Sequence, residues 1–258
     1  MEVLVFDFLP AVQAIELSEA PLTQVVAQVR FNSQSALSTH AGAIKFQEPL
    51  LDHYPRLLAE SQATITAAPG NVSSATIPQW RLTDLEGGWA CVVGPEHLTI
   101  ETSAYSTWPL LRDRLVAALD VLTDVAAPRV RERIGLRYVN HIPRDTEHGY
   151  IERVDSSLLG VVERPGWREQ LAVSLSQVVV RDGSTQLTVR YGRGEGVPGL
   201  PTDAFVIDID CGDETPGKFD ASSSLDYFDV LNDCALRCFF ASLAEPYRSS
   251  LLPAEGHA

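Results

Sequence analysis

The chain has 258 residues, and its 45% hydrophobic and 21% charged residues are ordinary for a globular protein with a substantial core. Its 34 Asp and Glu against 20 Lys and Arg give a formal net charge of -14 at pH 7. Nucleic-acid affinity comes largely from Lys and Arg that replace counterions, so this balance disfavours a broad phosphate-binding surface. It favours instead a basic partner protein, because an acidic surface steers basic partners toward it.

Targeting signals and paired cysteines are both missing from the sequence. Residues 1–10 lack the basic start and small-residue cleavage site of a signal peptide. No apolar run approaches the roughly 20 residues of a membrane-spanning helix, so we expect a cytoplasmic protein with no membrane contact. Cys91, Cys211, Cys234 and Cys238 include no pair at the two-residue spacing of a zinc knuckle or redox motif. We therefore expect buried, reduced thiols and no metal or cofactor.

The first half of the chain opens with an alternating stretch, residues 22–32, which predicts a strand because side chains two apart share a face. Residues 43–62 carry apolar residues at helical spacing, and Pro49 and Pro55 predict two short helices there rather than one. Thr107 caps a further helix with Pro109 in its first turn. The other elements expected before residue 128 are a loop with a short strand at 64–74 and strands at 79–85, 89–93 and 98–103.

The second half is organised around a strand at residues 129–142. Its apolar positions are Ile134, Leu136 and Tyr138, and Gly135, Arg137, Val139 and His141 occupy the opposite face. Asp182-Gly183 is the sharpest hairpin signal, because both residues tolerate positive φ. Ser223, with Asp226 three residues later, predicts the start of the last helix. The other expected elements are a short helix within 151–162 and strands at 168–181, 186–189 and 204–211.

The element order strand, helix, strands, helix therefore occurs twice. A repeat of this kind predicts an α+β fold built from two similar halves, residues 1–127 and 128–258, which together could also form a single compact domain. The arrangement resembles the strand-helix-strands-helix unit of TATA-binding-protein-like and helix-grip folds, a likeness of architecture that transfers no function. We expect one continuous antiparallel sheet, or two abutting ones, with the long helices on one face.

Short motifs scattered along nearly the whole chain carry a further resemblance. They are residues 21–26 ahead of Val29-Arg30-Phe31, His53-Tyr54-Pro55, Tyr105-Ser106-Thr107-Trp108, residues 133–142 and a Phe-rich last helix. In these motifs the chain resembles a sporadically distributed family of uncharacterised bacterial and archaeal proteins of about this length. The resemblance implies one complete protein and transfers no catalytic residue. A sporadic distribution fits an accessory of a mobile or defence system.

Polar side chains that alternate away from the helices define the candidate site. They come from several strands: Gln28, Arg30, Asn32, Glu101, Arg137, His141, Gln186, Thr188, Arg190, Asp208 and Asp210. Arginine suits forked recognition of a carboxylate or phosphate. We therefore take as candidate ligand- or partner-binding residues Arg30, Asn32, Arg137, His141, Arg190, Asp208 and Asp210. The structural alternative is that these groups form cross-strand ion pairs on a solvated face, each worth about 0.2 to 1 kcal/mol.

Catalytic interpretations are weaker. His141 beside Asn140 could act as a general base, but no nucleophile or third group completes a triad. Asp208 and Asp210 could hold magnesium together with acids of the last helix, Asp226, Asp229 or Asp233, or they could simply face solvent. Residues 192–196 are rich in glycine like a phosphate loop, but they precede no clear helix and lack its Lys-Ser/Thr pair. We therefore name no catalytic residue.

Two functions follow as hypotheses. The first is a non-enzymatic protein-interaction or regulatory protein whose sheet face, or acidic surface, binds another protein, with a homo-oligomer left open. The alternative is a small-ligand-binding protein or enzyme that uses a cavity between sheet and helices, with Arg30, Arg137 and His141 as anion-binding or acid–base groups. A deep pocket containing two of these three would favour the alternative, and a flat or filled sheet the first.

Overall fold

A computed structural model describes residues 6–12, 20–68, 71–145, 147–197 and 200–252. The strands are β1 (Leu22–Phe31), β2 (Arg56–Ala68), β3 (Asn71–Thr83), β4 (Trp89–Gly94), β5 (His97–Thr102), β6 (Val130–Pro143), β7 (Val173–Asp182), β8 (Thr185–Gly194), β9 (Ala204–Asp213) and β10 (Gly217–Lys218). The helices are α1 (His40–Gln47), α2 (Trp108–Val125), α3 (Ser156–Leu159), α4 (Ala221–Ala241) and α5 (Glu245–Leu251), with 3-10 turns η1 (Ser35–Ser38) and η2 (Glu48–Leu50).

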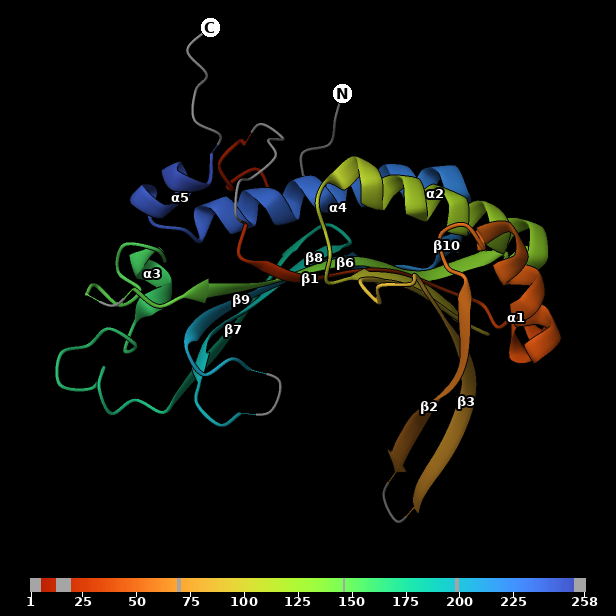
Figure 1. Cartoon of the computed structure of the whole chain (residues 1–258), viewed down its shortest axis with the longest axis horizontal. Helices are drawn as coiled ribbons and strands as arrows, with labels where there is room; N and C mark the ends of the chain where they lie inside the picture. Colours follow the sequence, from red (N-terminus) through yellow and green to blue (C-terminus); the bar gives the residue numbers. More distant parts are fainter. Residues whose placement is uncertain (1–5, 13–19, 69–70, 146, 198–199, 253–258) are drawn as a thin grey trace, which may run out of the picture.

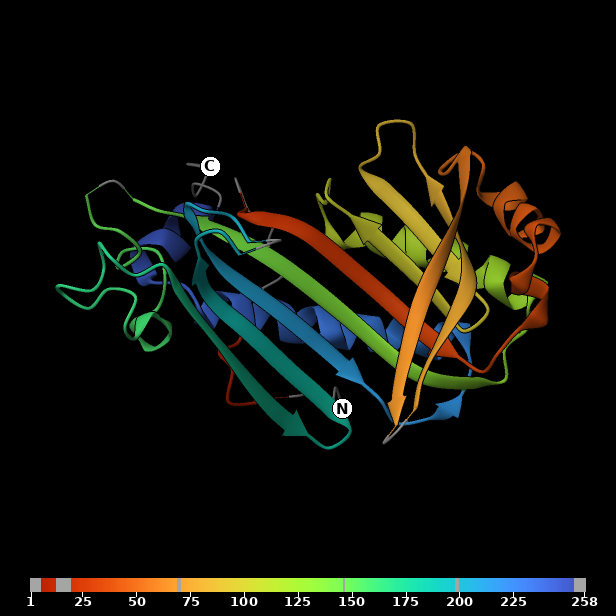
Figure 2. The same cartoon turned by 90° about the horizontal axis from the view of Figure 1, so that it is seen from below.

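These strands form one antiparallel sheet in the order β2-β3-β4-β5-β1-β6-β9-β8-β7, and β10 pairs with β6. The long helices α2 and α4 lie on one face, and the opposite face is open (Figures 1 and 2). The described fold is thus α+β with helices packed on an antiparallel sheet, as the sequence predicts.

The sheet is arched rather than flat. In Figure 1 the β2–β3 hairpin descends at one end, and β7 with the loops near α3 descends at the other. Register shifts in the β1–β6 pair, between Leu22 and Gln24 and between Arg30 and Phe31, lie near the two ends of that pair. Such irregularities increase local twist, which contributes to the arch. The open face consequently lies between two descending ends.

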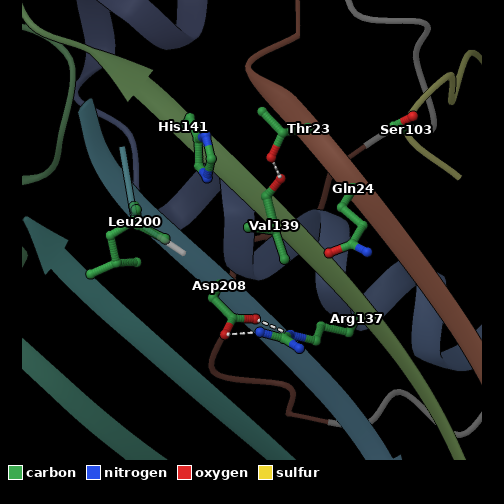
Figure 3. A pocket seen from close by; sticks show the side chains of 9 residues that line it. Thr23, Gln24, Ser103, Arg137, Val139, His141, Leu200 and Asp208 are labelled. Atoms are coloured by element: carbon green, nitrogen blue, oxygen red, sulfur yellow. Dashed lines mark hydrogen bonds and ion pairs between the residues drawn. The ribbon is translucent and has the colours of Figure 1, made fainter. Parts of the chain in front are cut away.

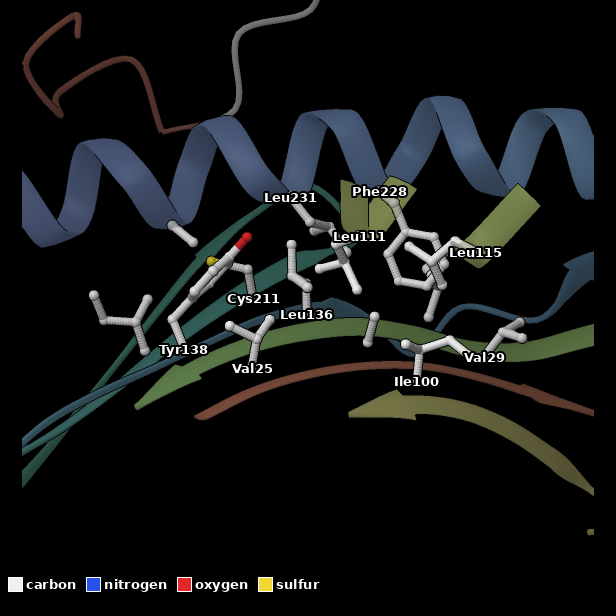
Figure 4. Close-up of a cluster of buried hydrophobic side chains, with 14 of the residues drawn as sticks. Val25, Val29, Ile100, Leu111, Leu115, Leu136, Tyr138, Cys211, Phe228 and Leu231 are labelled. Atoms are coloured by element: carbon white, nitrogen blue, oxygen red, sulfur yellow. The ribbon is translucent and has the colours of Figure 1, made fainter. Parts of the chain in front are cut away.

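The layer between sheet and helices is filled with apolar side chains (Figure 4). Alternation along β1 and β6 directs every second residue under the helices, and both long helices supply matching stripes. The residues labelled in the figure are Val25, Val29, Ile100, Leu111, Leu115, Leu136, Tyr138, Cys211, Phe228 and Leu231. The four cysteines are buried and free, with the Cys211 and Cys234 Sγ atoms 3.1 Å apart.

Capping explains where the two long helices begin. The Thr107 hydroxyl accepts a hydrogen bond from the Leu110 N–H at 3.4 Å, as the sequence predicts. For α4 the capping residue is Asp220, which accepts from the Ser223 N–H at 2.8 Å. The helix therefore starts before Ser223, which corrects the predicted boundary. No helix in the described part of the chain is both long enough and apolar enough to cross a membrane.

Three further sequence predictions are wrong. Residues 56–62 were expected in a second short helix but belong to β2, where Leu58 is 52% exposed. The stretch expected as mostly loop, residues 64–74, contains the ends of a long hairpin whose strands pair from Arg56–Thr83 to Ala68–Asn71. The helical spacing of Leu51 and Leu58 misled here because both side chains are exposed, at 48% and 52%, so neither belongs to a buried helical stripe. The strand expected from residue 168 begins at Val173.

The packing of β6 predicts a large stability effect at its centre. Leu136 is fully buried, so Leu136→Ala should lower the free energy of unfolding by about 2–5 kcal/mol through lost transfer energy and an unfilled cavity. Leu85, which is 62% exposed, is the matched control, and Leu85→Ala should change the free energy of unfolding by less than about 0.5 kcal/mol. Urea unfolding measures both, and equal effects would contradict this assignment of the core.

Candidate functional site

A buried carboxylate between two arginines is the centre of the open face. In the sheet register Asp208 of β9 lies directly opposite Arg190 of β8, and Arg137 reaches it diagonally from β6. The Arg137 Nε and Nη2 atoms donate to the two Asp208 oxygens at 2.6 and 2.8 Å. The Arg190 Nη1 atom donates to Asp208 Oδ2 at 3.3 Å. This fork compensates the cost of burying the carboxylate.

Exposure differs sharply within this group. The Asp208 side chain is 7% exposed, whereas those of Arg137 and Arg190 are 44% and 43% exposed. The carboxylate is therefore buried between the two arginines, while each arginine side chain keeps part of its surface exposed. The arrangement holds both arginines in place and leaves part of each available.

Two other ion-pair groups occupy the same face. Arg81 of β3 pairs with Glu60 at 2.6 Å and also with Glu101. Arg133 pairs with Asp210 at 3.4 Å and with Glu214 at 3.6 Å. The predicted cross-strand ion pairing therefore exists, but Arg81, Arg133 and Glu60 were not among the sequence candidates. Alternation along each strand places these residues on the open face. Their partners depend on the order of the strands in the sheet, which the sequence does not show.

Two depressions adjoin Asp208. The first, of about 390 Å³, is lined by Thr23, Gln24, Ser103, Arg137, Val139, His141, Leu200, Val206 and Asp208 (Figure 3). The second, of about 290 Å³, is lined by Leu175, Ser176, Gln177, Arg190, Tyr191, Leu200, Val206 and Asp208. They share Leu200, Val206 and Asp208. We call their union the open-face groove, which runs from β1 to β7 and changes along its length from polar to apolar.

The structure brings together four of the predicted residues, Arg137, His141, Arg190 and Asp208, in the groove. The other three do not line the groove, although Asp210 lies directly opposite Arg137 in the β6–β9 register.

Arg30 lies toward the far end of β1, opposite His97 of β5. Asp210 is held by Arg133. Asn32 follows β1, and its Oδ1 atom accepts from the Arg129 and Val130 N–H groups at 2.9 and 2.8 Å. Asn32 therefore fixes the start of β6 rather than lining the groove.

His141 does not form the acid–base pair that its neighbour suggested. Burial lowers the pKa of His141 below its usual value, which favours the neutral imidazole. Asn140 lies on the other face, where it donates to the Ile207 carbonyl at 3.2 Å. The side chains of these adjacent residues point to opposite faces of the strand, so Asn140 cannot orient the imidazole.

The magnesium hypothesis fails on topology. Asp208 lies on the open face, whereas α4, which carries Asp226, Asp229 and Asp233, packs on the opposite face against β6 and β9. Asp229 instead accepts from the Trp108 Nε1 atom at 2.8 Å and pairs with Arg112. Within the described ranges, no group of three or more His, Cys, Asp and Glu residues could hold a metal ion.

The phosphate-loop interpretation of residues 192–196 is also wrong. Gly192 to Gly194 continue β8, and Gly192 pairs with Leu175 and Val206 of its neighbours. A Cβ atom at Gly192 would lie 1.9 Å from the Ser174 carbonyl oxygen, so close strand packing requires glycine there. This glycine serves the sheet and not a ligand.

No protein-family model matches the chain, and no curated protein shows significant similarity to it. The resemblance to a sporadically distributed family therefore stays a prediction. The geometry of the open face carries the functional argument.

The histidines of this face provide a test of its electrostatics. Burial and then the positive charge of Arg30 lower the pKa of His97, whereas burial alone lowers that of His141. Arg30→Gln should therefore raise the pKa of His97 and leave that of His141 unchanged in a side-chain NMR titration. An unchanged pKa of His97 would show that Arg30 does not act on it.

The same shifts set the sign of a pH effect on stability. Between the lowered folded pKa and the unfolded value of about 6.5, the unfolded chain binds more protons than the folded one. The contribution of these two histidines is therefore complete above about pH 6.5 and decreases as the pH falls toward their folded pKa. Arg30→Gln should reduce this acid sensitivity.

Proposed function

We propose that this chain is a non-enzymatic protein-interaction or regulatory protein that binds another protein through the open face of its sheet. The observation that carries the proposal is the open-face groove, where two half-exposed arginines held by one buried carboxylate adjoin exposed apolar side chains. Arginine and aromatic side chains are enriched at protein interfaces, and the groove carries both, with Tyr191 beside Arg190.

Exposed apolar residues are frequent in β7 and in the segment before it: Ile151, Val161, Trp167, Val173, Leu175, Val178 and Val179. Among those of β7, Leu175 and Val179 lie on the open face with Gln177, whereas Val178, opposite Val189, lies on the other face. Trp167 is 48% exposed, and the Arg164 guanidinium lies 4.8 Å from its ring centre. Scattered surface apolar residues need no explanation, but a concentration of them supports a binding role.

The alternative, a small-ligand site or enzyme in a cavity between sheet and helices, has less support. The layer between them holds side chains such as Leu136, Phe228 and Leu111, which are fully buried. Arg137 and His141, two of the three residues that would favour that alternative, do share one depression, but it lies on the open face and not between sheet and helices. The groove is therefore better suited to a partner's surface than to an enclosed substrate.

Charge is divided between the two faces. Acids dominate the long helices, at Asp113, Asp120, Asp124, Asp226, Asp229 and Asp233. The open face carries arginines from six strands, at Arg30, Arg56, Arg81, Arg133, Arg137, Arg181 and Arg190, against the acids Glu60, Glu101, Asp208 and Asp210. A basic partner, which the overall charge favours, would meet the helices, whereas the sheet suits a partner with acidic groups.

We also propose that residues 1–127 and 128–258 are a structural repeat of TATA-binding-protein-like or helix-grip-like halves. Support comes from the sheet order, in which the first strand of each half pairs with the last long one, β1 with β5 and β6 with β9. The two first strands then pair with each other. A homo-oligomer and a role in a mobile or defence system stay further predictions.

Affinity capture from the native host with mass spectrometry tests the interaction role. We expect a stoichiometric partner with the wild type that is lost with Leu175→Asp/Val179→Asp, which changes side chains 51% and 41% exposed on the open face of β7. The matched control is Ile44→Asp/Leu110→Asp on the helices, both 39% exposed, which should retain the partner. Circular dichroism confirms that each variant folds.

Two outcomes would contradict the proposal. One is a partner captured equally by the β7 variant. The other is no partner, together with a small molecule released when the purified protein is denatured, which would favour the alternative.

A further inference from the structure

We propose that the open-face groove binds an acidic side chain of the partner protein, with its carboxylate against Arg137 and Arg190 and a neighbouring apolar side chain at Leu175 and Leu200. This inference rests on the proposed function and specifies the chemistry of the partner. It differs from the expectation of a basic partner that the net charge suggests.

Arg137 and Arg190 both keep N–H donors that Asp208 does not use. A guanidinium group has five N–H donors. Arg137 gives its Nε and Nη2 atoms to Asp208. Arg190 gives its Nε atom to Gln177 at 3.1 Å and its Nη1 atom to Asp208. Within the described residues no acceptor meets Arg137 Nη1 or Arg190 Nη2, and both side chains are over two-fifths exposed, at 44% and 43%.

The local charge around the groove also favours a carboxylate ligand. Among the described residues that line the two depressions, Asp208 is the one carboxylate, and it pairs with two guanidinium groups. The next acid, Asp210, lies opposite Arg137 in the register and acts on its charge, but it is paired with Arg133. Arg137 and Arg190 thus share one direct carboxylate partner, and a partner's carboxylate could accept from the donors that Asp208 does not use.

The shape of the groove suits an extended peptide segment. The polar end of the groove has Thr23, Gln24 and Ser103, and the other end has Leu175 and Tyr191. Alternate residues of an extended segment share one face, roughly 6.5 Å apart. An extended segment with an acid, any residue and then an apolar residue would direct its carboxylate to Arg190 and its apolar side chain toward Leu175, which lies one strand and two residues away in the register.

The source of the carboxylate follows from the overall charge. A formal charge of -14 repels small free anions, which have few other contacts to offset that repulsion. A protein segment adds apolar contacts with the exposed residues of β7. We therefore commit to an acidic side chain of a protein rather than a free anion.

The probes are two fluorescent extended peptides, Ser-Thr-Glu-Thr-Leu-Thr-Ser and its Gln counterpart, both with blocked ends, and free glutarate as the small-anion arm. Anisotropy and competition measure their binding to the full chain. Glutarate that competes as strongly as the Glu peptide would overturn the choice of a protein segment. Equal binding of the Glu and Gln peptides would overturn the proposed carboxylate site.

Substitutions of Asp208 and of Arg190 should change the affinity for the Glu peptide in opposite directions. Asp208→Asn removes the carboxylate that competes for both arginines, so it should tighten binding of the Glu peptide about tenfold, the effect expected of one charge-assisted contact. Arg190→Met should weaken it about tenfold. Arg181→Met, which changes another arginine of the open face outside the groove, is the matched control and should have no effect.

A purely structural role for Asp208 predicts the opposite result, because loss of its carboxylate would then loosen the arginines and weaken binding. If Asp208→Asn does not fold, the affinities of Arg190→Met and Arg181→Met for the Glu peptide are compared instead. Equal affinities of these two variants would overturn the inference. A partner captured from the host that is indifferent to both Asp208→Asn and Arg190→Met would leave the interaction role standing and reject the acidic contact. Peptide responses as expected, with no captured partner and a small molecule released when the purified protein is denatured, would reject the interaction role alone.

Discussion

The antiparallel pairing of β1 with β6 is the constraint on which the rest of the structure depends. It joins the two halves of the chain at the middle of the sheet, with Val25 opposite Tyr138 and Val26 opposite Arg137. A slip of one residue would move every side chain of one strand to the other face. The same register that buries Val25 and Leu136 under α4 therefore exposes Arg137 and His141 on the open face.

The buried Asp208 carboxylate makes the positions of two arginines from two strands dependent on one another. A carboxylate that is 7% exposed is stable only with partners, since removal of one partner of a buried ion pair leaves an uncompensated charge. Apolar residues would often fill such a position with no loss of stability. The ion pair is thus poorly explained by stability alone, whereas it does hold two guanidinium groups at fixed positions facing solvent.

Sequence alternation was enough to assign the faces of the sheet, because the rule that side chains two apart share a face needs no knowledge of neighbours. It placed Arg137, Arg190 and Asp208 on one side correctly. It could not show that β6 lies between β1 and β9, or that β4 lies between β3 and β5, so the pairing of Arg133 with Asp210 and of Arg81 with Glu101 was not predicted. Asn32 was misjudged because a polar side chain at a strand end can bind backbone as readily as a ligand.

Net charge is a poor guide to the partner of one face. The formal charge of -14 is the sum over two faces of different character, with acids on α2 and α4 and arginines on the open face. The acids of α2 and α4 lie beyond the apolar core layer, whereas Arg137 and Arg190 would contact the bound group directly. Because Coulomb energy falls with distance, the two arginines outweigh the acids of the helices at this position. Long-range attraction follows the overall charge, whereas recognition at contact follows the local charge of Arg137 and Arg190. The local arginines therefore determine which partner binds the sheet face.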